Sequence, residues 1–175
     1  GAVHSVVFGG FASKSLATRI DDAQPVLVVS ADAGMRGGKA VPYKPLLDEA
    51  MQLAEHKPAK VLLVNRGLDV MNMVAGRDVD YAALREQHMH AQVPVTWLES
   101  NEMSYVLYTS GTTGPPKGVM QTHGNHLANI RQAREAEIYD DSSVFIALLP
   151  LAHSFAKLMG NIGFVTPATL EFPAI

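Results

Sequence analysis

A short segment rich in glycines and hydroxyl side chains carries the strongest chemical signal of this sequence. Residues 109–118 read TSGTTGPPKG and follow the apolar run YVLY at 105–108. Glycines let backbone N–H groups approach an anion, hydroxyls donate short hydrogen bonds, and a lysine supplies a mobile positive charge. The segment therefore predicts contacts with the phosphates of a nucleotide.

The position of the lysine excludes a phosphate loop of the Walker type. That loop requires Gly directly before the Lys and Ser or Thr directly after it, whereas Lys117 lies between Pro116 and Gly118. An ordinary surface turn is the alternative interpretation, because Gly and Pro mark turns more often than ligand sites. The loop holds no acid–base pair, which favours phosphate binding and charge stabilisation over proton transfer.

Residues 108–118 resemble the phosphate loop of the adenylate-forming enzymes, the superfamily of acyl-CoA synthetases, luciferases and peptide-synthetase adenylation domains. The resemblance implies that the loop binds ATP, with Lys117 acting catalytically by neutralising the charge of the departing pyrophosphate. Any Mg²⁺ would arrive with ATP, held largely by phosphate oxygens. The implied phosphate-binding residues are Thr109, Ser110, Gly111, Thr112, Thr113, Gly114 and Lys117.

Two cations flank a pair of glycines in the run Arg36, Gly37, Gly38 and Lys39. Residue types alone favour an exposed loop with solvated charges, and the alternative is a phosphate contact with Arg as a fork and Lys as a point charge. Residues 1–11 and 30–34 resemble the acetyl-/propionyl-CoA synthetase branch of the superfamily. That resemblance implies that the basic run contacts the phosphates of coenzyme A.

The segment 149–155, LPLAHSF, holds the third candidate site. A lone His in an apolar context is more often a packed or capping residue than a catalyst. The segment resembles the Pro-x-x-His segment of the family, which implies that His153 and Phe155 line the pocket for the acyl group of a small-molecule carboxylate. Thr122 or Asn125 is expected to cap a helix, with His123 structural. The seven His residues show no ligand spacing, so no metal site built by the protein is predicted.

Composition narrows the function classes further. The 175 residues suffice for one domain with a sizeable core, and a net charge of −3 without a long basic run gives no electrostatic case for nucleic acid. No apolar run is long enough to span a bilayer. The absence of Cys excludes disulfides and thiolate chemistry, and is compatible with the cytoplasm, where we expect the protein to reside. The start at Gly1, without Met, leads us to expect a partial sequence.

The elements that position these residues alternate between strands and helices, which predicts an α/β fold with a mostly parallel sheet flanked by helices. The phosphate loop is expected to follow a strand and to precede a helix, and residues 31–41 are expected to form a polar loop. The expected strands are 2–8, 25–30, 60–65, 95–98, 104–108 and 143–149. The expected helices are 15–23, 44–57, 81–88, 125–137 and 152–162, and 163–175 shows no clear period.

The resemblance makes residues 1–175 a single, incomplete part of the large N-terminal domain of an adenylate-forming enzyme. Up to the loop the chain resembles the propionyl type, and from Gly118 onward it resembles fatty acyl-CoA synthetases. A junction between two branches is therefore expected near 109–123, with ordinary divergence as the alternative. Nothing in the chain matches the adenine, ribose or distal lysine motifs of the family.

The expected function is that of a fragment of an ATP-dependent acyl-CoA synthetase, an acid–thiol ligase that is inactive as a fragment. The alternatives are an adenylation domain that serves a carrier protein, and a non-catalytic binding or scaffold segment.

Overall fold

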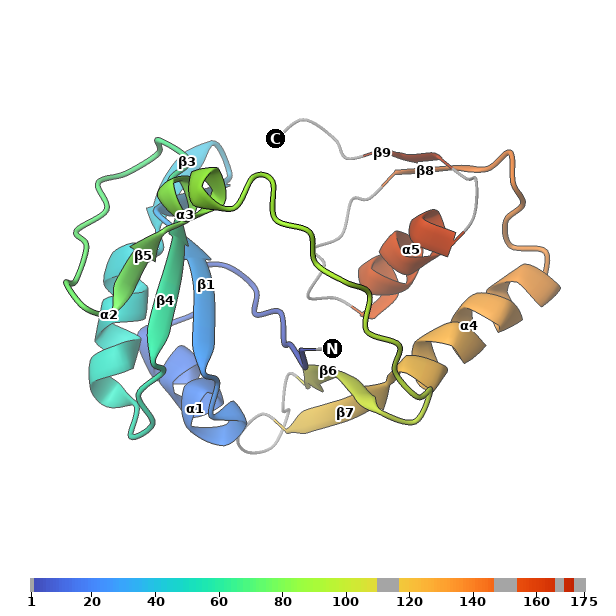
Figure 1. The fold of residues 1–175 in the computed structure, drawn as a ribbon, viewed down its shortest axis with the longest axis horizontal. Coiled ribbons are helices and arrows are strands. Elements are labelled where there is room, and N and C mark those ends of the chain that lie inside the picture. The colour runs from blue at the N-terminus through green and yellow to red at the C-terminus, as the bar shows by residue number, and fades with distance from the viewer. Residues whose placement is uncertain (1, 110–116, 147–153, 166–168, 172–175) are drawn as a thin grey trace. The chain divides into compact units, whose positions relative to one another are not determined.

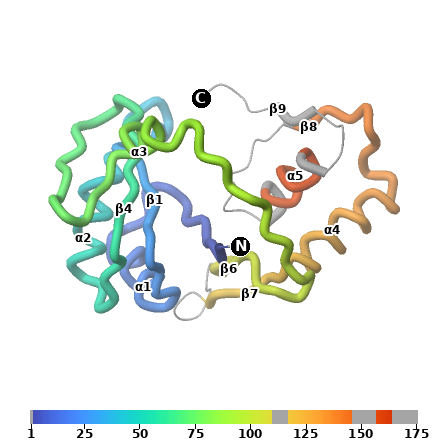
Figure 2. Tube along the Cα trace, in the orientation of Figure 1, coloured from blue at the N-terminus to red at the C-terminus, as the bar shows by residue number. Residues whose placement is uncertain are grey.

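The computed structural model describes residues 2–109, 117–146, 154–165 and 169–171, as Figure 2 traces. The chain forms two compact units, which we name the sheet unit and the hairpin unit after their main strands. The sheet unit is Gly9–Pro94, and the hairpin unit combines Gly1–Phe8 with Val95–Ile175.

A parallel sheet forms the centre of the sheet unit (Figure 1). Its strands are β1 (Leu27–Ala31), β4 (Lys60–Val64) and β5 (Asp78–Asp80), in the order β1-β4-β5. All neighbouring strands run parallel, with Leu27 opposite Lys60 and Val61 opposite Asp78. The predicted strands at 25–30 and 60–65 are thereby confirmed, and β5 was not predicted.

Two helices supply most of the apolar core of the sheet unit: α1 (Ser13–Ala23) and α2 (Lys44–Leu53). Val61 and Leu63 of β4 are both fully buried, as expected for alternate residues on one face of a strand. The buried cluster consists of Ala17, Ile20, Leu47, Ala50, Met51, Ala54, Val61 and Leu63. One face of β4 is thus sealed by the apolar faces of both helices.

Helix α2 ends earlier than the sequence predicts. Its last residue is Leu53, and Ala54 has an extended backbone with ψ of 144°. The ammonium of Lys57 donates hydrogen bonds to the carbonyl oxygens of Met51 and Ala54, at 2.6 and 2.5 Å. Because the last carbonyls of a helix lack partners within it, this lysine satisfies them and stabilises the early end.

The remaining elements of the sheet unit are short. Strands β2 (Ala33–Arg36) and β3 (Lys39–Pro42) form an antiparallel hairpin. Helix α3 (Tyr81–Gln87) begins where the Asp80 carboxylate accepts a hydrogen bond from the Ala83 amide at 3.0 Å, which confirms the predicted helix there.

The hairpin unit begins with two antiparallel strands, β6 (Met103–Tyr108) and β7 (Gly118–Thr122). Helix α4 (His123–Glu135) follows directly, and Thr122 caps it. The Thr122 hydroxyl accepts from the Asn125 amide at 3.2 Å, and the Asn125 side chain accepts from the Thr122 amide at 2.9 Å. This reciprocal capping box confirms the predicted cap and fixes the start of the helix two residues before the predicted one.

The C-terminal part of the hairpin unit is a β-α-β segment. Strands β8 (Val144–Ile146) and β9 (Thr169–Glu171) are parallel, and α5 (Ser154–Val165) lies between them in the sequence. Ile130 and Ala133 of α4, Tyr139, and Ile162 of α5 form its buried cluster. A helix in the predicted range 152–162 is confirmed within the described residues, while β9 lies where no element was predicted.

Two predicted strands are wrong. Residues 2–8 make only an isolated bridge between His4 and Tyr105, with the Val106 amide donating to the His4 carbonyl at 3.0 Å. Residues 95–98 pair with no strand among the described residues, and the Trp97 side chain is 90% exposed. Apolar runs of this length become strands only where a partner strand supplies backbone hydrogen bonds.

The α/β class is confirmed in its coarse form: a small parallel sheet with helices. The expectation of a mostly parallel arrangement holds only in part, since β2–β3 and β6–β7 are antiparallel. None of the described helices is both long and apolar enough to cross a membrane.

Candidate functional site

The two ends of the glycine-rich loop are joined by three hydrogen bonds between Thr109 and Lys117. The Thr109 amide donates to the Lys117 carbonyl at 3.0 Å. The Thr109 hydroxyl donates to the same carbonyl at 3.4 Å and accepts from the Lys117 amide at 3.4 Å. Both residues are exposed. They continue the β6–β7 ladder, in which Tyr108 lies opposite Gly118, so strand pairing fixes both ends of the loop.

The predicted order of strand, loop and helix is found, with one more strand than the sequence predicts. Strand β7 lies between the loop and α4, because residues 118–122 pair with β6. The positive end of the α4 dipole therefore begins only at His123, a whole strand beyond Lys117. The interior of the loop, with Ser110, Gly111, Thr112, Thr113 and Gly114, lies outside the described residues.

The basic run forms the tip of the β2–β3 hairpin, so the prediction of a polar loop at 31–41 is wrong. Gly37 and Gly38 have φ of +56° and +75°, the left-handed values that a two-residue turn of type I′ requires at both positions. Arg36 and Lys39 lie directly opposite each other across the hairpin. Directly opposed residues share one face of the ladder, and both side chains are exposed. The fold therefore brings the two predicted cations together.

Tyr43 fixes this hairpin to the segment before α1. A Cβ atom added to either Gly9 or Gly34 would overlap the ring and hydroxyl of Tyr43, so neither position has room for a side chain. A Cβ on Gly10 would come within 3.9 Å of the Arg36 guanidinium. The glycines thus let two backbone segments close around one tyrosine, and Arg36 reaches back over Gly10.

Asp32, just before the hairpin, is fully buried and bound by backbone amides. Its carboxylate accepts from the amides of Leu68, Arg66 and Asp69, at 2.7, 3.0 and 3.1 Å. Burial alone would raise the pKa of this carboxyl, but the backbone hydrogen bonds outweigh it and hold the pKa at about 2. Asp32 therefore ties the loop after β4 to the start of the hairpin as an anion at neutral pH.

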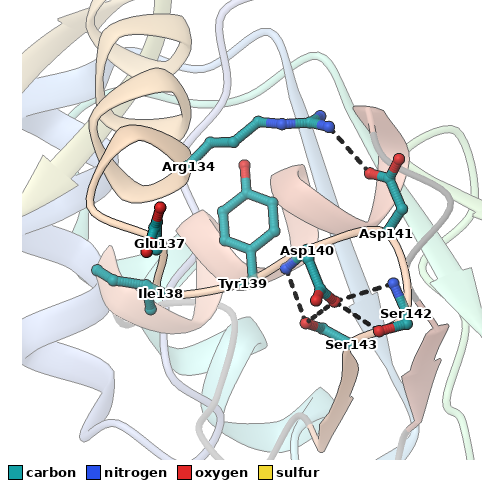
Figure 3. Close-up of a pocket in the computed structure, with 8 residues that line it drawn as sticks. All are labelled: Arg134, Glu137, Ile138, Tyr139, Asp140, Asp141, Ser142 and Ser143. Carbon is teal, nitrogen blue, oxygen red and sulfur yellow. Dashed lines mark hydrogen bonds and ion pairs between the residues drawn. The ribbon is translucent and has the colours of Figure 1, made fainter.

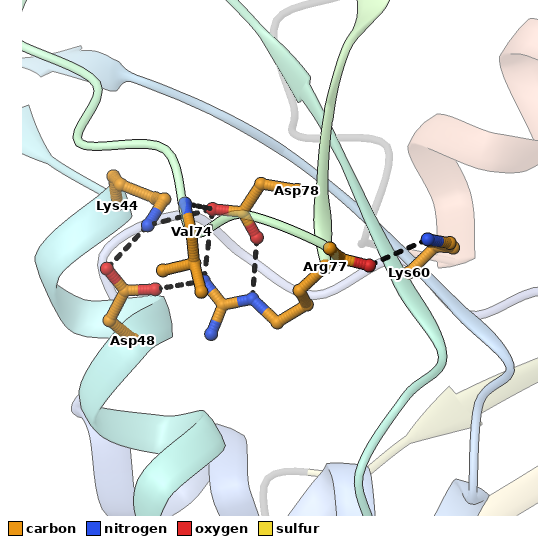
Figure 4. Close-up of polar contacts among 7 residues, drawn as sticks. Lys44, Asp48, Lys60, Val74, Arg77 and Asp78 are labelled. Carbon is orange, nitrogen blue, oxygen red and sulfur yellow. Dashed lines mark hydrogen bonds and ion pairs between the residues drawn. The ribbon is translucent and has the colours of Figure 1, made fainter.

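A network of ion pairs holds β5 against α2 (Figure 4). The ammonium of Lys44, which is only 1% exposed, lies 2.5 Å from Asp48 and 3.1 Å from the buried Asp78. Arg77 contacts both carboxylates at 2.5 Å. Burial opposes ionisation of Asp78, yet the Arg77 hydrogen bond and its other partners lower its pKa to about 2. Each charge has a partner within the network, which indicates a structural role.

A cluster that the sequence gave no sign of lies in the hairpin unit. The Lys157 ammonium of α5 lies 2.7 Å from His4 Nε2 and 3.2 Å from the centroid of the Tyr105 ring. The Tyr105 ring contacts His126 of α4, with ring centroids 6.2 Å apart. Burial lowers the pKa values of His4 and His126, and nearby Lys157 lowers both further. These residues are far apart in the sequence, so no spacing motif could have indicated the cluster.

A surface hollow after α4 holds none of the predicted site residues (Figure 3). Its polar groups bind one another: Asp140 accepts from the Ser142 and Ser143 hydroxyls at 2.7 and 2.9 Å, and Arg134 pairs with Asp141 at 3.1 Å. The Tyr139 hydroxyl donates to the Ile130 carbonyl at 3.2 Å. The residues around the hollow therefore form a turn that is held by its own hydrogen bonds and ion pair, which indicates a structural role.

His153, predicted to line an acyl pocket, lies outside the described residues, and so does the side chain of Phe155. The Phe155 backbone belongs to the first turn of α5. Among the described residues, no three His, Cys, Asp or Glu side chains are grouped so that they could hold a metal ion.

Comparison with known proteins gives the family. The sequence model of the AMP-binding enzymes matches residues 1–169. Propionate–CoA ligase of Escherichia coli (strain K12) is 68% identical over 126 residues, which are 72% of this chain and 20% of that protein. The mitochondrial acyl-CoA synthetase short-chain family member 3 of Rattus norvegicus is 45% identical over 128 residues, 72% of this chain and 18% of that protein. The chain spans about a fifth of the length of these curated relatives. It belongs to the AMP-binding enzyme family.

Proposed function

We propose that the chain is the part of an AMP-forming acid–thiol ligase that holds the ATP phosphates and contacts coenzyme A. The whole protein would join a carboxylate to ATP, giving an acyl adenylate and pyrophosphate, and would then transfer the acyl group to the thiol of coenzyme A. The carboxylate oxygen is the nucleophile of the first step, so no covalent enzyme intermediate is required. Family membership and the names of the relatives support this assignment.

The pairing of Thr109 with Lys117 is the observation that carries the ATP assignment. Three hydrogen bonds join the two loop ends, and the loop between them is rich in glycines and hydroxyls. A fixed base lets such a loop present amides, hydroxyls and one ammonium to a polyphosphate without a large loss of backbone entropy. We assign Lys117 the stabilisation of charge on the departing pyrophosphate, and any Mg²⁺ to the phosphate oxygens.

The β2–β3 hairpin, called the basic hairpin for Arg36 and Lys39 at its tip, suits the phosphates of coenzyme A. Arg36 and Lys39 lie opposite each other at an exposed tip, where a guanidinium fork and an ammonium can contact one phosphate group together. Gly37 and Gly38 set the turn that brings the cations together. An adenylation domain serving a carrier protein would not need this pair, so the response of Arg36 variants to coenzyme A separates the two functions.

The carboxylate pocket is proposed at His153 and Phe155, by resemblance to the Pro-x-x-His segment of the family. We propose a junction between branches near 109–123, since the identity to curated ligases covers 126 residues while the family model reaches residue 169. The pocket residues lie beyond that junction. The substrate is therefore assigned only as a small-molecule carboxylate, without an acyl chain length, and the protein is assigned to the cytoplasm.

A graft tests the proposal directly. Residues 1–118 of this chain would replace the corresponding segment of the E. coli propionate–CoA ligase, and pyrophosphate release and thioester formation would be measured with propionate. We expect an active graft, in which Lys117→Ala lowers kcat for adenylate formation by roughly 10²-fold, the usual scale for a group that stabilises developing charge. Arg36→Ala should raise the KM for coenzyme A and leave adenylate formation unchanged.

The 175-residue chain alone is expected to release no pyrophosphate above background. An active chain would contradict its assignment as one part of the machinery. A folded graft that binds neither ATP nor coenzyme A would overturn the proposed function.

A further inference from the structure

The side chain of Lys157 has an unusual set of neighbours for a lysine. Its Nζ lies over the face of the Tyr105 ring, 3.2 Å from the centroid, and 2.7 Å from His4 Nε2. Within the described part of the chain, the ion pairs do not include this ammonium. An ammonium without a carboxylate partner loses less on giving up its proton than a paired one does.

In the described part of the unit, the titratable groups near this amine are His4, Tyr105 and His126, and His123 acts on both histidines. His4 comes from the N-terminal segment, and His126 and His123 come from α4. Tyr105, whose ring lies under the ammonium, is fully buried, and burial raises the pKa of its hydroxyl. Both His4 and His126 have lowered pKa values, chiefly through burial, which favours the neutral form of each ring. His4 Nε2 is then the acceptor for the Lys157 proton.

Burial lowers the pKa of Lys157 to about 8. At pH 7.5 roughly a quarter of such an amine is unprotonated, against roughly one part in a thousand for an ordinary lysine with a pKa of about 10.4. The side chain is nevertheless only half-buried. It therefore combines a populated lone pair with access from solvent, which is the requirement for a nucleophilic lysine.

We propose that Lys157 is a site of covalent acylation by acyl thioesters. The choice of a thioester as donor rests on the proposed function, since a thioester is the product of that reaction. The unprotonated Nζ attacks the thioester carbonyl carbon, a C–N bond forms, and the C–S bond breaks. The thiol leaves as a thiolate. The nitrogen loses one proton, which passes first to His4 Nε2, the nearest acceptor, and then to the thiolate. The products are an amide on Lys157 and a free thiol.

The test uses the whole 175-residue chain and preformed propionyl-CoA at pH 7.5, with mass spectrometry of peptides to follow each lysine. The internal reference is Lys14, an exposed lysine of α1. A less basic amine is intrinsically a weaker nucleophile, which cancels part of the gain in unprotonated amine. We therefore expect Lys157 to react about tenfold faster than Lys14. Lys157→Arg removes that fast site.

Two further measurements keep the proposal falsifiable. His4→Asp places a carboxylate beside the ammonium and should slow Lys157 to the rate of Lys14. In the unaltered chain, the Lys157 rate should level off above about pH 8, the pKa of its amine. Equal rates for Lys157 and Lys14 at pH 7.5, with a Lys157 rate that keeps rising up to pH 10, would overturn the proposal. Because the thioester is supplied ready-made, labelling does not depend on ligase activity, and an inactive graft would overturn only the proposed function.

Discussion

Thr109 and Lys117 close the base of the glycine-rich loop from both sides: the Thr109 amide donates to the Lys117 carbonyl at 3.0 Å, and the Lys117 amide donates back to the Thr109 hydroxyl at 3.4 Å. A residue at one end of the loop thus fixes the backbone of the lysine at the other end. Placement of the cation therefore depends on a hydroxyl as well as on the strand pairing of Tyr108 with Gly118.

Removal of that hydroxyl should weaken ATP binding in the graft. Thr109→Val keeps the shape of the side chain but loses both of its hydrogen bonds to Lys117, each of which contributes about 0.5–1.5 kcal/mol. We expect a rise of roughly 3–10-fold in the KM for ATP, measured by pyrophosphate release. Thr109→Ser is the matched control, since it keeps the hydroxyl and should stay close to the parent. An unchanged KM in the valine variant would show that strand pairing alone positions the loop.

The turn at the tip of the basic hairpin should tolerate only some side chains. Gly37 and Gly38 both have positive φ, and a Cβ at either position meets no atom within 4 Å. The cost of substitution is therefore conformational rather than steric. We expect Gly38→Ala to lower the free energy of unfolding by about 1–2 kcal/mol. Gly37→Asn, with a residue that suits a type I′ turn, should cost less. Urea denaturation of the 175-residue chain measures both.

The same variants should affect coenzyme A more than ATP. A distorted turn separates Arg36 from Lys39, which lie opposite each other in the hairpin. In the graft, Gly38→Ala should therefore raise the KM for coenzyme A, with the KM for ATP unchanged. Equal increases in both constants would indicate a general loss of structure instead.

Gly34 is expected to tolerate no side chain, and here the reason is steric rather than conformational. A Cβ there would overlap the ring and hydroxyl of Tyr43, so Gly34→Ala should destabilise the chain by about 1–3 kcal/mol through overpacking. Tyr43→Ala removes the obstructing atoms. The double variant should then be more stable than the sum of the two single changes predicts. Additive effects in urea denaturation would contradict the packing of Tyr43 against Gly34.

Local signals explain which parts of this fold the sequence can predict. The Thr122 cap depends on residues three positions apart, and the capping box forms as that pattern implies. The strands β1 and β4 carry apolar runs bounded by turn residues. The Gly37-Gly38 pair is itself a hairpin signal, but the strand before it, Ala33–Arg36, lacks apolar alternation and resembles a loop.

Tertiary contacts decide the parts that the sequence does not reveal. Residues 2–8 have the composition of a strand yet make only a bridge at His4, because a strand exists only where backbone partners are available. The shorter α2 depends on where Lys57 folds back. The Lys157 cluster joins the N-terminal segment to α5, so its contact has no local pattern at all. Candidate site residues that belong to a local motif, such as Lys117 and Arg36, could be proposed from the sequence, whereas the Lys157 cluster could not.

Acid should destabilise the sheet unit through two carboxylates. Asp32 and Asp78 both have pKa values of about 2 in the folded chain, against about 3.9 in an unfolded one. A lowered pKa means that the unfolded state binds the proton more tightly. The stability that these groups contribute is therefore fully present above about pH 4 and is lost as the pH falls from there toward 2. Urea denaturation followed by circular dichroism between pH 7 and pH 3 measures this slope.

Asp32→Asn separates the contribution of Asp32 from that of Asp78. An asparagine can accept from some of the amides of Arg66, Leu68 and Asp69, but its NH₂ group would face at least one of these donors. We expect a loss of about 1–3 kcal/mol at pH 7 and a shallower fall of stability below pH 4. Asp69→Asn, at an exposed side chain, is the control and should leave both nearly unchanged. If Asp32→Asn keeps the full acid dependence, the buried carboxylate is not the group that the acid protonates.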